Sequence, residues 1–194
     1  MRKHIARISM LVAVALWVTG CGYNTLIDKE EAVKKAWGDI DASLQRRADL
    51  IPNLVETVKG YASHEKETLQ AVIEARAKAT QTQISVNDLE NVEAMQKFQQ
   101  AQGGLSSALS RLMVVVERYP DLKANQNFMD LQAQLEGTEN RITVERQKFN
   151  QTTQTYNAYI RKFPQVIYAG WFGFEKKTYF EAQQGAEKAP EVQF

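Results

Sequence analysis

Apolar residues recur at intervals of three and four through most of residues 28–163, and this spacing is the strongest constraint on the fold. In an α-helix such positions share one face, so the pattern predicts amphipathic helices that pack against one another. The helix breakers glycine and proline number only 10 and 4 in 194 residues, so turns should be few and helices long. The sequence contains no alternating strand pattern or hairpin turn. We therefore expect an all-α fold, a long antiparallel bundle of three to four helices.

The first helix is expected to begin at Asp28, to kink near Pro52 and to end near Thr82. Its apolar positions keep their phase across Pro52, although a proline inside a helix removes one hydrogen bond; a complete break there is the alternative. Such a helix would be about 80 Å long, against about 50 Å for each later helix. We expect the chain to fold back at Pro52, or the C-terminal segment to cover the unmatched part. Otherwise an apolar strip would face another molecule, formed by Trp37, Ile40 and Leu44.

Two further helices are expected over residues 87–119 and 127–163, each closed by a proline at its C-terminal end. The segment after Pro164 is rich in aromatic residues. Trp and Tyr favour the interface of a membrane, but we prefer a plug that closes one end of the bundle. The aromatic residues of this segment are Tyr168, Trp171, Phe172, Phe174, Tyr179 and Phe180.

Residues 1–20 are typical of a bacterial export signal. A basic start precedes an apolar run over residues 8–18, which is shorter than the roughly 20 residues that a bilayer-spanning helix needs. The run leads into a sequence that resembles a lipobox, so cleavage would leave Cys21 as a lipidated first residue; an uncleaved membrane anchor is the alternative. The lipobox residues before Cys21 are Val18, Thr19 and Gly20.

If Cys21 is lipidated, the rest of the chain divides into a tether, a helical domain and a tail. Two or more acyl chains would hold it on a bilayer, with residues 21–27 as a tether, 28–182 as the helical domain and 183–194 as a flexible tail. Residue 22 is Gly and not the Asp that often retains lipoproteins at the inner membrane. In a cell envelope with two membranes, this favours the periplasmic face of the outer membrane.

Several blocks of the mature sequence resemble the LemA family. The resemblance implies a membrane-associated bacterial envelope protein with a long antiparallel helical bundle and no established catalytic activity. Many family members keep an uncleaved N-terminal transmembrane helix, where this sequence has a lipobox. The matching blocks are Tyr23-Asn24, Ala36-Trp37, Ile40-Asp41, residues 46–62, His64-Glu65, residues 117–125, Phe128, residues 138–142, Tyr156-Asn157, Phe163-Pro164, Gly173-Phe174 and Tyr179-Phe180.

The sequence offers little for catalysis or for binding small ligands. Beyond the export signal it has one histidine, His64, and its one cysteine is assigned to lipid, so neither a catalytic triad nor a zinc site is expected. Gly103-Gly104 lacks the Lys-Ser or Lys-Thr of a phosphate loop. A net charge of +1 gives no attraction for nucleic acid. We expect no metal, cofactor, nucleic acid or small-molecule substrate.

One group of polar residues should lie inside the bundle, at positions near or on the apolar faces. If the first and third helices are neighbours, these residues would form a network that fixes the register of the helices. Paired catalytic carboxylates or a carboxylate metal site are the less favoured interpretation, because the Glu-x-x-His pairs of di-iron bundles are absent. The network residues are Asp41, Arg46, Arg47, Asp49, Thr138, Glu139, Arg141, Glu145 and Arg146.

These features together predict a membrane-tethered, non-enzymatic envelope protein. It would act as a helical scaffold or interaction module for another envelope protein or for a second copy of itself. A sensor or regulatory subunit of a membrane enzyme is the alternative, and an envelope hydrolase is less expected.

Overall fold

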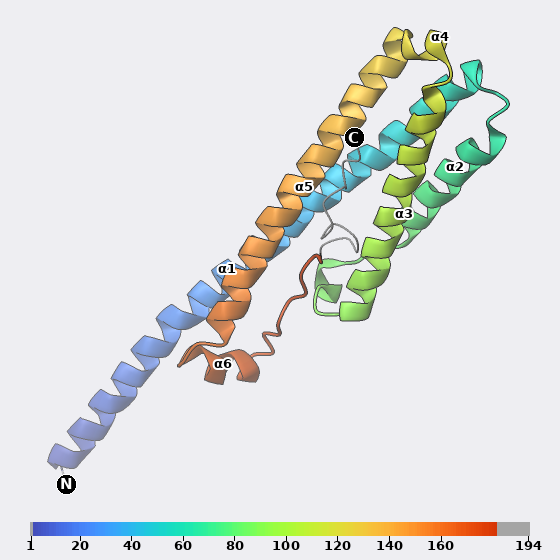
Figure 1. The fold of residues 1–194 in the computed structure, drawn as a ribbon. Helices are drawn as coiled ribbons and strands as arrows, with labels where there is room; N and C mark the ends of the chain where they lie inside the picture. Colours follow the sequence, from blue (N-terminus) through green and yellow to red (C-terminus); the bar gives the residue numbers. More distant parts are fainter. Residues whose placement is uncertain (1, 182–194) are drawn as a thin grey trace, which may run out of the picture.

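The computed structural model describes the backbone of residues 2–181 and the side chains of residues 22–181. Every regular element in that range is helical, as the sequence spacing predicts (Figure 1). The elements are α1 (Arg2–Tyr61), α2 (Lys66–Gln81), the 3₁₀ turn η1 (Val86–Asp88), α3 (Val92–Val116), α4 (Pro120–Lys123), α5 (Gln126–Ile160) and α6 (Gln165–Trp171).

The long helices form two antiparallel pairs. α1 packs along α5, and α2 packs along α3 (Figure 1). The side chains of Asn91 and Asn125 cap the beginnings of α3 and α5 by accepting hydrogen bonds from Ala94 N and Phe128 N, both at 3.0 Å. α3 therefore starts at Val92 and not at the predicted Asn87. The two helix pairs confirm the predicted antiparallel bundle.

The first helix differs from the prediction in where it ends. α1 continues as a helix through Pro52 and stops at Tyr61, and the chain reverses over residues 62–65 into the separate helix α2. The expected single helix as far as Thr82 is therefore wrong. A continuous helix and two helices joined by a short turn have the same spacing of three and four, so the sequence pattern could not separate them.

A side chain of α2 explains how α1 tolerates its internal proline. Pro52 has no N–H to donate to the carbonyl of Ala48, four residues earlier, and Ala48 is buried at 4% exposure. The Nε of Arg76 donates to this carbonyl oxygen at 2.7 Å instead. The turn at residues 62–65 thus brings back the group that satisfies the acceptor left by Pro52.

The core has two parts, one near each end of the bundle. The part near the turns is built from α1, α2, α3 and α5 around Ile51 and Leu112. The other part contains Trp37, whose ring lies 5.4–5.9 Å from those of Phe98, Phe149 and Phe180.

The apolar strip of α1 is covered within the chain. Trp37 is 3% exposed and Ile40 is 0% exposed, with Leu44 half-buried beside them. These residues therefore do not form an exposed strip on α1, because Phe98 of α3, Phe149 of α5 and Phe180 of the C-terminal segment pack on Trp37. Ile40 and Leu44 line the cleft described below. Cover by the C-terminal segment was one of the expected solutions.

Residues 174–181, here called the C-terminal strap, run along α5 without regular secondary structure (Figure 1). Asn157 donates to Lys177 O at 2.8 Å and accepts from Lys177 N at 2.9 Å. Asn150 makes the same two bonds with Phe180, both at 2.9 Å. The spacings match, because seven helical residues and three extended residues each span about 10 Å. Two turns of α5 therefore hold the strap by its backbone.

The aromatic segment acts as a plug only in part. Tyr168 and Phe180 are buried, whereas Trp171 and Phe172 are 79% and 61% exposed.

None of the helices, within the residues described, combines the length and apolar character needed to cross a bilayer.

Residues 21–27, the expected tether, are helical and continue into the bundle as part of α1. Leu26 is buried at 0% exposure, and a Cβ on Gly22 would lie 2.2 Å from the hydroxyl of Tyr168. The side chains of the lipobox residues Val18, Thr19, Gly20 and Cys21 lie outside the described part of the chain, as does the expected tail over residues 183–194.

Candidate functional site

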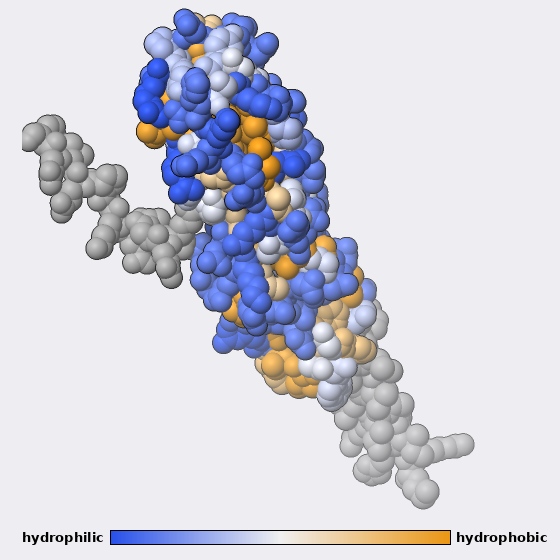
Figure 2. Space-filling view, turned by 90° about the vertical axis from the view of Figure 1, so that its right-hand side faces the viewer, coloured by the Kyte–Doolittle hydropathy of each residue, from blue (hydrophilic) through white to orange (hydrophobic). Residues whose placement is uncertain are grey.

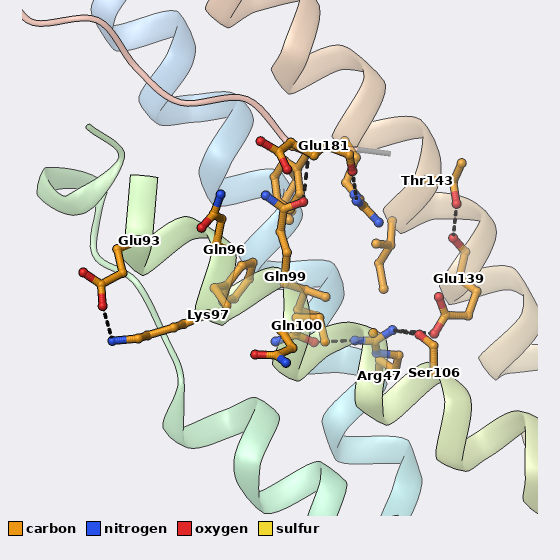
Figure 3. Close-up of a pocket in the computed structure, with 18 residues that line it drawn as sticks. Arg47, Glu93, Gln96, Lys97, Gln99, Gln100, Ser106, Glu139, Thr143 and Glu181 are labelled. Atoms are coloured by element: carbon orange, nitrogen blue, oxygen red, sulfur yellow. Dashed lines mark hydrogen bonds and ion pairs between the residues drawn. The ribbon is translucent and has the colours of Figure 1, made fainter. Parts of the chain in front are cut away.

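A cleft of about 900 Å³ lies between α3 and α5, with α1 as its floor (Figure 3). One end of the cleft is bordered by Phe180 and Glu181 at the end of the C-terminal strap. Its lining mixes apolar, amide and charged side chains: Ile40, Leu44, Arg47, Glu93, Gln96, Lys97, Phe98, Gln99, Gln100, Gln102, Gly103, Ser106, Glu139, Ile142, Thr143, Arg146, Phe180 and Glu181.

Arg47 on α1 joins the two walls of the cleft. Its Nη1 donates to Glu139 Oε1 of α5 at 2.5 Å and to Ser106 Oγ of α3 at 3.1 Å, and its Nη2 donates to Gln102 Oε1 (Figure 3). The side chain of Arg47 is only 2% exposed, whereas that of Glu139 is 40% exposed. A buried guanidinium needs such a fork of partners, because an unpaired buried charge is costly.

Arg146 of α5 is the second arginine in the cleft. Its guanidinium carbon lies 4.7 Å from the ring centroid of Phe180, and its Nη2 donates to Glu181 O at 3.3 Å. Burial lowers the pKa of Arg146, the positive charge of Arg47 lowers it further, and Glu139 opposes both effects. Arg146 thus fixes the end of the strap on α5 while it adds positive charge to the cleft.

The α3 wall of the cleft supplies side-chain amides above an apolar floor. Gln99 already binds the chain's own backbone, because its Oε1 accepts from Glu181 N at 3.0 Å. Gln96 and Gln100 line the same wall. Amides that both donate and accept, beside apolar side chains, match the needs of a peptide backbone with apolar side chains.

The structure brings together only part of the predicted polar network. Arg47 and Glu139 pair directly, and Arg146 lies in the same cleft. Glu145 pairs with Lys148 at 3.3 Å instead, and Thr138 donates to Gln134 O within its own helix at 2.7 Å. The remaining predicted members are exposed and do not line this cleft: Asp41, Arg46, Asp49 and Arg141.

Sequence reasoning missed a second buried polar cluster, centred on Lys177 of the strap. Lys177 is 6% exposed, and its Nζ pairs with Glu90 and, at 3.2 Å, with Glu30. The ring of Tyr156 lies 5.7 Å below the same ammonium. In the sequence, Lys176-Lys177 is an ordinary basic pair, and only the position of the strap shows that one lysine is buried.

Groups of three or more His, Cys, Asp or Glu that could hold a metal ion are absent from the part of the chain that was described. His64 is exposed in the turn between α1 and α2 and does not line the cleft.

Comparison with known proteins identifies the family. The model of the LemA family matches residues 36–194. Magnetosome proteins MamQ 1 and MamQ 2 of Paramagnetospirillum magneticum are each 26% identical to this chain, over 93% of it and 72% of their own length. Protein LemA of Metamycoplasma hominis is 25% identical, over 76% of this chain and 60% of its own. The chain belongs to the LemA family.

Proposed function

We propose that this chain is a membrane-tethered, non-enzymatic protein of the bacterial cell envelope that binds a segment of a partner protein in the cleft between α3 and α5. The continuity of α1 carries the proposal. One helix runs from the export-type N-terminus to Tyr61 and supplies the floor of the cleft through Arg47. At 1.5 Å per residue, Arg47 lies about 40 Å along the helix from Cys21.

A rigid connection of this kind sets the distance between the membrane and the cleft. A flexible tether would let the bundle sample many heights, whereas a packed helix holds one. Leu26 and Val33 are buried at 0% exposure, so α1 is part of the core directly after the proposed anchor. This supports a scaffold that presents its binding site at a fixed height.

The C-terminal strap supports a peptide segment as the partner. Asn150, Asn157 and Gln99 hold an extended backbone through side-chain amides, and the last two residues of the strap, Phe180 and Glu181, line the cleft. Elsewhere in the cleft, the glutamines of α3 and the apolar floor offer the same chemistry. Extended peptides bind other proteins through main-chain hydrogen bonds, with pockets for alternate side chains; here side-chain amides would supply the hydrogen bonds.

The membrane tether is tested by intact mass of the full-length protein extracted from membranes, beside a Cys21→Ser variant. We expect a mature chain that begins at Cys21 and carries acyl chains. In the variant we expect neither cleavage before residue 21 nor acylation. An unprocessed mass in the membrane fraction would contradict lipidation and indicate an uncleaved anchor. Recovery in the soluble fraction would contradict the tether itself.

The binding role of the cleft is tested by placing a photo-crosslinking amino acid at Thr143, which lines the cleft, or at Val144, which is exposed but does not line it. In cells we expect a covalent adduct with one protein from position 143 and none from position 144. Loss of that adduct on changing Gln96 and Gln100 to Ala would link it to the α3 wall. Equal adducts from both positions would contradict a specific site.

A further inference from the structure

An apolar surface remains exposed at one end of the bundle, around α6. Figure 2 shows apolar side chains gathered at the lower end of the described surface. The three most exposed, Phe163, Trp171 and Phe172, are 81%, 79% and 61% exposed. We call this the α6 surface, and it consists of Tyr23, Phe163, Val166, Ile167, Trp171 and Phe172.

α6 is apolar on two opposite faces. One face buries Tyr168 and Ala169 against the bundle, at 6% and 3% exposure. The opposite face carries Val166, Ile167 and Trp171, at 49%, 45% and 79% exposure. A helix on the surface of a globular protein usually has a polar outer face, so a second apolar face indicates a second contact.

The packing of α6 places this surface beside the N-terminal part of α1. Gly22 contacts the side chain of Tyr168, and its carbonyl accepts a hydrogen bond from Tyr159 at 3.3 Å. Tyr23 packs its ring edge against Phe172, with 5.0 Å between centroids. The apolar run of residues 8–18 ends only five residues before Tyr23 in the same helix, about 8 Å along its axis.

The chemistry of the α6 surface fits a lipid interface. Trp and other aromatic side chains favour the zone between headgroups and acyl chains. Arg161 and Lys162 precede the surface and Lys176 follows it, all exposed, and Glu175 is the one acidic residue in the sequence from 161 to 176. This charge favours anionic headgroups.

We propose that the α6 surface inserts into the headgroup region of the bilayer that holds the N-terminus. The inference rests on the membrane tether of the proposed function. The protein then contacts the membrane at two places, the tether and α6. Two contacts fix the rotation of the bundle about the axis of α1, which a single tether would leave free.

The test measures the emission of Trp171 in vesicles. A full-length Trp17→Phe protein removes the tryptophan of the N-terminal run, and Trp37 is buried in the bundle. The protein is reconstituted in phosphatidylcholine and phosphatidylglycerol vesicles, with the phosphatidylcholine either unmodified or brominated near the interface or near the bilayer centre. We expect emission to fall most with bromine near the interface, and we expect this loss to disappear when Trp171 is also changed to Phe.

Flotation of the same vesicles separates the possible outcomes. Protein that floats with unquenched Trp171 overturns the inference and leaves the tether intact; a dimer cross-linked through Ile167 would then assign the surface to a second copy. Protein that does not float overturns both the tether and the inference. Because the Trp171 side chain is 79% exposed, Trp171→Phe should leave the unfolding temperature unchanged. Measuring this temperature is the control that the variant is folded.

Discussion

Arg47 and Glu139 are 92 residues apart in sequence and form an ion pair of 2.5 Å across the floor of the cleft. The same guanidinium binds Gln102 and Ser106 of α3, so one side chain of α1 links both walls. The position of α3 relative to α5 therefore depends on a planar fork of donors from Arg47. This dependence leads to the first prediction.

Arg47→Lys should lower the free energy of unfolding by about 2–4 kcal/mol, because a lysine keeps the charge and cannot reproduce the fork to both walls. Urea unfolding of the two proteins measures the difference. Arg46→Lys is the matched control, since Arg46 is exposed and should change stability by less than about 0.5 kcal/mol. Equal effects at the two positions would show that the fork does not hold the walls together.

Arg76→Met should destabilise the protein by about 1–3 kcal/mol, because it leaves the buried carbonyl of Ala48 without a donor. The effect should depend on Pro52. In a Pro52→Ala background the new N–H of residue 52 can donate to Ala48 O, so the loss caused by Arg76→Met should become smaller. A double-mutant cycle by urea unfolding checks this, and strict additivity would contradict it.

Asn157→Asp should loosen the C-terminal strap. The aspartate can still accept from Lys177 N, but it cannot donate to Lys177 O and instead places a negative charge beside that oxygen. We expect faster hydrogen exchange at residues 175–181, with little change at the turn around residues 62–65. Asn140→Asp, at an exposed position of the same helix, is the control; equal acceleration there would show a general effect of charge on α5.

Tyr156 should make stability depend on alkaline pH. Burial raises its pKa, and the carboxylates of Glu30, Glu90 and Glu175 raise it further. A folded pKa above the unfolded value of about 10 means that this stabilisation is complete below pH 10 and is lost as pH rises beyond it. At pH 8, Tyr156→Phe should be less stable by about 1 kcal/mol, because it lacks the hydrogen bond to Glu175 O.

Above pH 10 the difference in free energy of unfolding between wild type and Tyr156→Phe should become smaller, because only the wild type must keep this tyrosine protonated to stay folded. Unfolding in urea at both pH values measures this difference, and the comparison cancels the other tyrosines and lysines. A difference that stays constant or becomes larger would contradict a raised pKa of Tyr156.

Local features of the sequence determined much of the fold. The period of three and four positions fixed the helical class, since it alone places apolar residues on one face. α5 begins within one residue of the predicted start, because Asn125 satisfies the first N–H groups of this helix. α3 begins at Val92 and not at the predicted Asn87, because Asn91 is the residue that caps it. A cap depends on residues within one turn, so the sequence by itself contains it.

The tertiary structure decided where α1 ends and which side chains form the cleft. The reversal at residues 62–65 depends on α2 packing against α1, where Arg76 reaches Ala48, 28 residues away. Arg47 and Glu139 could be proposed as neighbours from their helical positions, but their partners on α3 could not. The spacing of apolar residues shows which face of its own helix a residue occupies, whereas only the packed structure shows which other helix that face contacts.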